Sequence, residues 1–335
     1  MEPLFIEVAV PDVTTKDYKM KVVLIIGNGF DLDLGWQTQF SHFAKSSFWP
    51  PKPSQYTRMY DYLNTRRTIS QWFDLERIFA EYVNPNSGVT SKRYAANDAP
   101  FFQILSHSLG RYLAVEQEKP IREGSVAGRV LSAVLSVSSF AKIYTFNYTD
   151  LRLIASKLGL KAGFVYEHVH GNLSDDSVIL GIQDDAEVCE GYEFLYKTFN
   201  KYYSSYEILF DLLDADEVIF FGHSLGKTDY HYFQRFFQMQ CRSDMKRREG
   251  KKITIFTYDY ASRISTLKQL RSMNNKRTDL LFNQNELNIF MTDGSDDEKI
   301  NVFLAELSKR VKNDNKKQVL RSISEGIQMK FLSQL

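Results

Sequence analysis

The sequence predicts an α/β fold, built as a doubly wound, mostly parallel sheet with a mainly helical insertion. Residues 21–27, KVVLIIG, form a continuous apolar and largely β-branched run that ends in glycine, which is typical of the first strand of such a domain. Three further runs, 142–146, 217–222 and 252–257, share this character. Strands buried on both faces are continuous apolar runs, so these segments favour a parallel sheet covered by helices.

Residues 50–140 contain no convincing strand, and we expect them to form a helical insertion between the first two runs. The segment begins with PPKPS at 50–54, which is typical of a stiff linker. Apolar residues at spacings of three and four then predict two amphipathic helices. The first stripe consists of Trp72, Leu75, Ile78, Phe79 and Tyr82, and the second of Phe102, Leu105, Leu109 and Tyr112.

The second half of the chain adds weaker elements. Residues 164–166 and 178–181 are short candidate strands, and the aromatic-rich stretch 191–213 is a candidate long helix. A further helix is expected over 228–241, with Thr228 as its N-cap.

These elements predict an α/β domain of residues 20–49 and 141–300 around a helical insertion of residues 50–140. Residues 1–19 are expected to be an N-terminal extension, and residues 301–335 a C-terminal helical tail. Met20 directly precedes the first strand and is an alternative translation start.

Composition and charge argue against several classes of protein. The net charge of +1 gives no whole-chain signature of nucleic-acid binding, although a local basic patch stays open. Cys189, Cys241 and the six histidines lack zinc-site spacing, so no metal site and two reduced thiols are expected. No apolar run reaches the length of a membrane helix, and the first residues lack the pattern expected of a signal peptide. We therefore expect a cytoplasmic protein without a membrane partner.

The first candidate site directly follows the first strand and consists of Gly27, Asn28, Gly29, Phe30 and Asp31. Glycines there allow a ligand to approach the backbone closely, and a helix that starts there directs its N–H groups at a phosphate. Leu32 stands where the dinucleotide-binding fingerprint needs a third glycine. A tight strand-to-helix turn without a ligand is therefore the alternative.

The second candidate site, TFNYTD at 145–150, follows the second strand. Ligands bind at this edge of open α/β sheets. The side chain of Asn147 carries both donors and an acceptor, so it can orient a water molecule or a sugar hydroxyl. A helix cap is the alternative role for this asparagine.

The third candidate site is His168-Val169-His170-Gly171, in which the two histidines face the same side of an extended segment. His170, followed by glycine, is a candidate general base, and His168 replaces it if the strand register differs by two. A structural histidine and a metal ligand are alternatives, although no third ligand has a recognisable spacing.

The fourth candidate site, GHSLG at 222–226, follows another strand and would line a second wall of the same cleft. Gly222, Ser224 and Gly226 formally satisfy the GxSxG pattern of a hydrolase nucleophile elbow. In α/β-hydrolases the catalytic histidine follows the serine and the acidic residue in the chain. Here only His231 follows Ser224. The elbow is therefore the weaker interpretation.

Taken in order, the motifs VLIIGNGFDLDLGWQTQFSHF, WFDLERIFAEY, TFNYTD, HVHGNL and GHSLGKTDYHYF resemble those of the bacterial abortive-infection AbiH family over about residues 20–260. The resemblance implies a role in phage defence, with a phage component as a candidate activator. A homo-oligomer is compatible with the sequence.

The motif order is also similar, more distantly, to the sirtuin-like NAD-binding fold. The matching positions are Gly27, Gly29 and Gly35 in the opening turn, Thr145 and Asn147, His170 and Gly171, and Gly222 and Ser224. Two departures argue against protein deacylation: the chain lacks a four-cysteine zinc module, and Thr149 replaces an aspartate. The sirtuin-like domains of phage-defence systems, several of which hydrolyse NAD, are the closer analogy.

The resemblance implies that NAD is the ligand and that its nicotinamide–ribose bond is the candidate target. In this hypothesis Asn147 holds a water or a ribose hydroxyl, His170 takes a proton, and residues 27–31 hold the pyrophosphate. Gly222 and Ser224 contact the ribose of the adenosine half. Two rival classes stay open: a nucleotide sensor that does not cleave, and a metal-dependent nuclease-like effector that uses the carboxylates of Asp31, Asp33 and Asp150.

Overall fold

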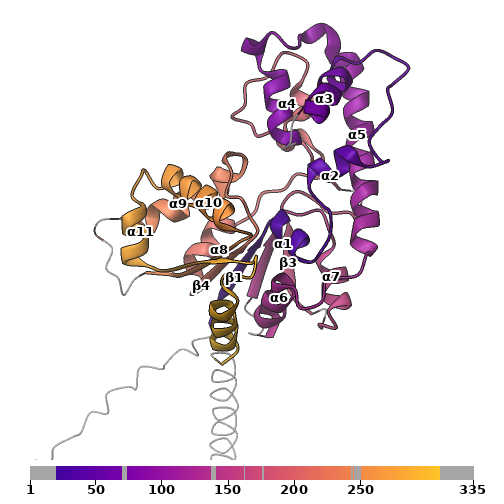
Figure 1. Ribbon diagram of the computed structural model, residues 1–335. Coiled ribbons are helices and arrows are strands. Elements are labelled where there is room, and N and C mark those ends of the chain that lie inside the picture. Colours follow the sequence, from indigo (N-terminus) through magenta and orange to yellow (C-terminus); the bar gives the residue numbers. More distant parts are fainter. Residues whose placement is uncertain are drawn as a thin grey trace, which may run out of the picture.

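The computed structural model describes residues 20–69, 74–136, 141–161, 163–175, 177–242, 244 and 250–309. Its centre is a six-stranded sheet in which every strand pair is parallel, with the order β3-β2-β1-β4-β5-β6. Helices cover both faces of the sheet, and a helical unit stands beyond one end of it (Figure 1). The predicted doubly wound α/β fold is confirmed, and the sheet is wholly rather than mostly parallel.

Five of the six strands lie where the apolar runs predict them. They are β1 (Val22–Ile26), β2 (Ala141–Thr145), β3 (Val165–His168), β4 (Glu217–Phe221) and β5 (Lys252–Thr257). The register places Ile26 beside both Thr145 and Phe221, and Thr145 beside His168. The segments that follow β1 to β4 therefore leave the sheet at one common edge.

Two features of the sheet differ from the prediction. The sixth strand, β6 (Glu286–Met291), is missed because it is an edge strand that is only partly buried, so its residues form no continuous apolar run. The strand expected at 178–181 is wrong, since only an isolated bridge between Ile182 and Tyr196 forms near there.

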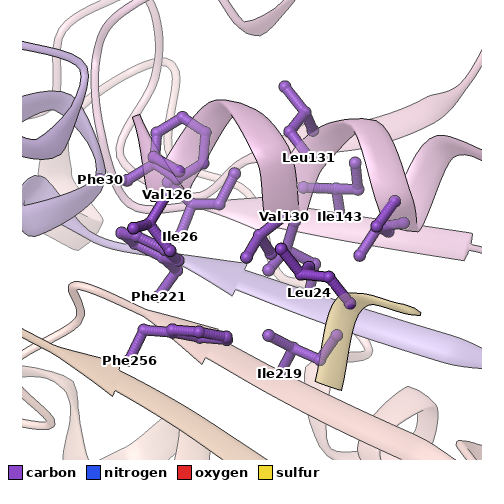
Figure 2. Packing of buried hydrophobic residues seen from close by; sticks show 14 of the residues in the cluster. Leu24, Ile26, Phe30, Val126, Val130, Leu131, Ile143, Ile219, Phe221 and Phe256 are labelled. Carbon is purple, nitrogen blue, oxygen red and sulfur yellow. The ribbon is translucent and has the colours of Figure 1, made fainter. Parts of the chain in front are cut away.

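Successive side chains of β1 point to opposite faces of the sheet and enter two different cores. Leu24 and Ile26 pack with α6 (Val126–Ser136) on one face, as Figure 2 shows. A helix over residues 297–309 packs in the same layer, as do residues of the helices α1 (Asn28–Asp33) and α7 (Leu151–Lys157). Val23 and Ile25 face the other core. The helices of that second layer are α8 (Ile208–Asp214), α9 (Tyr230–Met239), α10 (Tyr260–Met273) and α11 (Thr278–Gln284).

The helical unit has a hydrophobic core of its own. Its helices are α2 (Phe40–Lys45), α3 (Arg58–Ile69), α4 (Leu75–Val83) and α5 (Lys92–Glu118), with the short turn η1 (Pro85–Ser87). Both predicted apolar stripes are buried in this core, except Trp72, which lies outside the described residues. Helix α6 packs on the sheet although it falls within the predicted insertion range of 50–140.

The long helix predicted over 191–213 is wrong. The chain there forms the short turns η2 (Glu193–Leu195) and η3 (Lys197–Phe199), and only its end is helical, as α8. Tyr192 and Leu195 are buried in the core of the helical unit, so their apolar character reflects a loop that crosses to that unit. Thr228 is not the N-cap of α9, which begins at Tyr230 after the turn η4 (Lys227–Asp229). Residues 1–19 and 310–335 lie outside the described part.

Candidate functional site

A cavity of about 270 Å³ lies at the common edge where β1, β2 and β4 end. The order of strands reverses between β1 and β4, and open α/β sheets bind ligands at that point. The helical unit supplies the other wall through residues 38–41, Glu76 and Leu113. Seven of the predicted site residues line the cavity: Gly27, Asn28, Asp31, Asn147, His170, Gly222 and Ser224.

Three other predicted site residues, Gly29, Phe30 and Thr145, do not line the cavity. Gly29 N–H donates to the carbonyl of Gly222 at 2.9 Å, and Phe30 N–H donates to the carbonyl of Gly27 at 2.9 Å. These two amides are therefore already bonded within the protein and do not face a phosphate. The Phe30 ring packs in the sheet core, and the Thr145 hydroxyl accepts the N–H of Asn147.

Glycine is required at 29 and 222 because two backbone segments touch there. A Cβ atom on Gly29 would lie 2.6 Å from the Cα of Gly222. Gly222 has a φ of 63°, a conformation that favours glycine. This contact seats the short helix α1 (Asn28–Asp33) against the end of β4. The glycines of the first and fourth motifs thus fix the floor of the cavity.

Asp31 is the centre of one polar cluster in the cavity. The Asn147 amide nitrogen donates to Asp31 Oδ1 at 2.9 Å and to the carbonyl oxygen of Gly27 at 3.1 Å. The Thr149 hydroxyl donates to Asp31 Oδ2 at 2.9 Å. Burial raises the pKa of Asp31 to about 7, although both donors oppose the shift. These bonds use both hydrogens of the Asn147 side-chain amide. The side-chain oxygen Oδ1 of Asn147 is therefore left as an acceptor.

His170 belongs to a second polar cluster. Its Nε2 atom lies 3.4 Å from Nζ of Lys197 and 3.6 Å from Oδ1 of Asp229. Lys197, only 1% exposed, also pairs with Oε1 of Glu76 at 2.8 Å. His223 Nε2 lies 3.4 Å from Oδ2 of Asp229. Glu76 belongs to the helical unit, so this cluster connects that unit to the sheet edge.

The electrostatics of the second cluster follow from its burial. Burial and then the Lys197 charge lower the pKa of His170 to about 3, so its imidazole is neutral near pH 7. Burial raises the pKa of Glu76 to about 7, against the effect of the lysine. Burial alone would raise the pKa of Asp229, but His223, His170 and Lys197 bring it below its ordinary value. Asp229 is therefore ionised, and it lies between His170 and His223.

The sequence-based prediction missed Glu76, Lys197 and Asp229 as parts of the site. Asp229 lies in the GHSLGKTDYHYF motif and Glu76 in WFDLERIFAEY, so both motifs carried the signal. Lys197 lies in a loop without a motif, and no pattern in the chain marks its burial.

Comparison with known proteins identifies the family. The family model described as bacteriophage abortive infection AbiH matches residues 23–247, about two thirds of the chain. This chain belongs to the AbiH family. The predicted resemblance is thus confirmed, and with it a place among abortive-infection, phage-defence proteins.

Two further comparisons add less. No curated protein matches the chain. Among solved structures, a Sir2 enzyme matches with a TM-score of 0.28 and 13% identity, covering 79% of this chain and 94% of that chain. The fold class of this AbiH protein rests on its own strand order. No helix within the described ranges is long and apolar enough to cross a membrane.

The two histidines of the third motif have different places in this AbiH protein. His168 does not line the cavity: its Nδ1 atom lies 3.0 Å from the backbone oxygen of Asn147, and its carbonyl accepts the hydroxyl of Tyr206. His170 faces the cavity. Gly171, with a φ of 75°, is required because a Cβ there would lie 1.8 Å from the Ser177 carbonyl oxygen.

The carboxylates of the nuclease-like hypothesis do not gather at one point. Asp33 accepts bonds from the Arg122 guanidinium and the Ala127 N–H, away from the cavity. Asp150 caps α7 (Leu151–Lys157) through the N–H of Arg152. Within the described parts of the chain, no group of three or more histidine, cysteine or acidic side chains could hold a metal ion.

The elbow hypothesis also lacks its geometry. The Ser224 hydroxyl accepts the N–H of Gly226, while the neighbouring His223 ring is turned toward Asp229. His223 Nδ1 accepts the N–H of Leu225 at 3.0 Å, which places the ring proton on Nε2, the atom that faces the aspartate. The histidine is therefore oriented for Asp229 and not for the serine.

Proposed function

We propose that the cavity binds NAD and hydrolyses its nicotinamide–ribose bond, and that this activity serves abortive infection. The observation that carries the proposal is the convergence of Asn147, Asp31 and His170 at the switch point of a parallel sheet. Ligands of doubly wound folds bind at this point, and buried polar groups with displaced pKa values mark functional sites. Activation by a phage component and homo-oligomer formation remain predictions.

Cleavage of the nicotinamide–ribose bond needs little acid catalysis. The nicotinamide ring of NAD is cationic and leaves as a neutral molecule, so no proton donor is needed. The site supplies orientation, a placed water and stabilisation of an oxocarbenium-like ribose. Asn147 Oδ1 accepts a hydrogen bond from the water or from a ribose hydroxyl, because Asp31 and Gly27 hold the amide in place.

His170 takes the water proton in this proposal. A neutral imidazole with a pKa of about 3 is a weak base. A weak base suffices here because an oxocarbenium-like carbon reacts readily with water, and the proton leaves late. Asp229, whose Oδ1 lies 3.6 Å from Nε2, stabilises the imidazolium as it forms.

A second candidate is a nucleotide sensor that binds without cleaving. The approach of Lys197 to Nε2 of His170, at 3.4 Å, favours this alternative because it occupies the basic atom of the ring. In that case Asn147 and His170 only recognise sugar hydroxyls.

Incubation of the purified protein with NAD, with and without a chelator, tests the proposal. We expect equal amounts of nicotinamide and ADP-ribose to appear, at a rate that the chelator does not change. Binding of NAD without release of nicotinamide would leave the sensor as the function. Absence of both binding and release would refute the proposal.

A further inference from the structure

We propose that the cavity receives the cationic nicotinamide ring of NAD against Asp229 and leaves the pyrophosphate outside. This inference deepens the proposed function and rests on it. It also reverses the expectation that residues 27–31 hold the pyrophosphate.

The charge of the cavity wall is the first argument. Four carboxyl groups line it, those of Asp31, Asp74, Glu76 and the ionised Asp229, and none of its described lining residues is a lysine or arginine. Lys197 is a neighbouring buried cation, but it is paired with Glu76. Phosphates are bound by arginine, lysine or unbonded N–H groups. The amides of Gly29 and Phe30 are bonded internally, so the wall offers a pyrophosphate neither a cationic side chain nor these two donors.

An unsatisfied acceptor is the second and independent argument. Asp229 is 8% exposed and lines the cavity, and its Oδ1 atom is buried with no hydrogen-bond partner within the described residues. A buried carboxylate oxygen without a donor is costly, so a ligand that supplies a donor or a positive charge gains affinity there. The carboxamide N–H₂ and the positive ring of oxidised nicotinamide supply both.

An aromatic side chain that lines the same cavity fits the same ligand. Phe146 lines the cavity, and its ring centroid lies 4.5 Å from that of His223 and 5.3 Å from that of His170. A flat cationic ring placed near Phe146 gains a cation–π contact in addition to the aspartate. The oxidised cofactor has this charge and the reduced cofactor, NADH, does not, although the two share every phosphate.

Calorimetric titration with three ligands tests the inference. We use carba-NAD, in which a carbon replaces the ribose ring oxygen so that the bond resists cleavage, its reduced form, and ADP-ribose. We expect carba-NAD to bind about tenfold or more tightly than either of the others, the order expected for one close charge pair. Asp229→Asn should bring the oxidised and reduced forms to within about threefold.

Asp150→Asn is the matched control, because it removes one negative charge outside the cavity and asparagine retains the helix cap. It should keep the preference for the oxidised ring. Equal affinity of the wild-type protein for the oxidised and reduced forms would overturn the inference while leaving nucleotide binding in place, and this comparison needs no variant. Binding of none of the three ligands would overturn the proposed function and the inference together.

Discussion

Replacement of Lys197 by methionine tests the buried ion pair that connects the helical unit to the site. The Lys197 ammonium is 1% exposed and lies 2.8 Å from Oε1 of Glu76. Removing one partner of a buried pair leaves the other charge uncompensated, which costs about 3–5 kcal/mol of unfolding free energy. Glu76 has a pKa of about 7 even with the lysine present, so the lone carboxyl can take a proton. The loss should therefore be larger at pH 8 than at pH 6.

Urea unfolding at both pH values measures this effect. Adding Glu76→Gln to Lys197→Met should restore part of the lost stability, because the buried charge is then gone. Lys201→Met, at an exposed lysine four residues on, should change the unfolding free energy by less than about 0.5 kcal/mol. A loss below about 1 kcal/mol for Lys197→Met, or purely additive effects in the double variant, would refute the reasoning.

Two other substitutions test the first cluster and the glycine contact. The folded-state pKa of Asp31, about 7, lies above its ordinary 3.8, so folding favours the protonated form and the wild type loses stability as pH rises between these values. The stability of Asp31→Asn relative to wild type should thus increase by up to about 4 kcal/mol from pH 4 to pH 8, and melting temperatures with a pH-independent difference would contradict this. Gly29→Ala should cost about 1–3 kcal/mol because its Cβ meets the Gly222 backbone, whereas Gly163→Ala, which meets nothing within 4 Å, should be nearly neutral. Equal melting temperatures for the two alanine variants would show that the contact is not tight.

The buried strands could be predicted from the sequence because burial on both faces leaves a continuous apolar run. Residues 22–26 and 217–221 are wholly buried and were found. The edge strand β6 lacks this signal. The strand predicted at 178–181 and the helix predicted over 191–213 are wrong because Leu180, Tyr192 and Leu195 pack in the core of the helical unit, and local periodicity cannot distinguish such a buried loop from a regular element.

The site could be predicted in part. Polar residues that directly follow parallel strands must meet at one edge of the sheet. The sequence could therefore predict that Asn147 and His170 lie together in the cavity at that edge. The roles of single atoms could not be predicted, because they depend on partners far along the chain. Gly29 turns its N–H to Gly222, and Lys197 reaches His170 from a loop without a motif.

NAD turnover of Asn147→Ala compared with Thr149→Val tests the central claim most directly. Each substitution removes one hydrogen-bond donor to Asp31, and Asn147→Ala also removes the donor to the Gly27 carbonyl, so each should cost roughly 1–3 kcal/mol of stability, with the larger loss for Asn147→Ala. Only Asn147→Ala also removes the acceptor that orients the water or ribose. We predict that it lowers turnover by about 10²-fold or more, while Thr149→Val lowers it by less than about tenfold. Equal loss in both variants, or an Asn147→Ala protein that is destabilised yet fully active, would contradict the account.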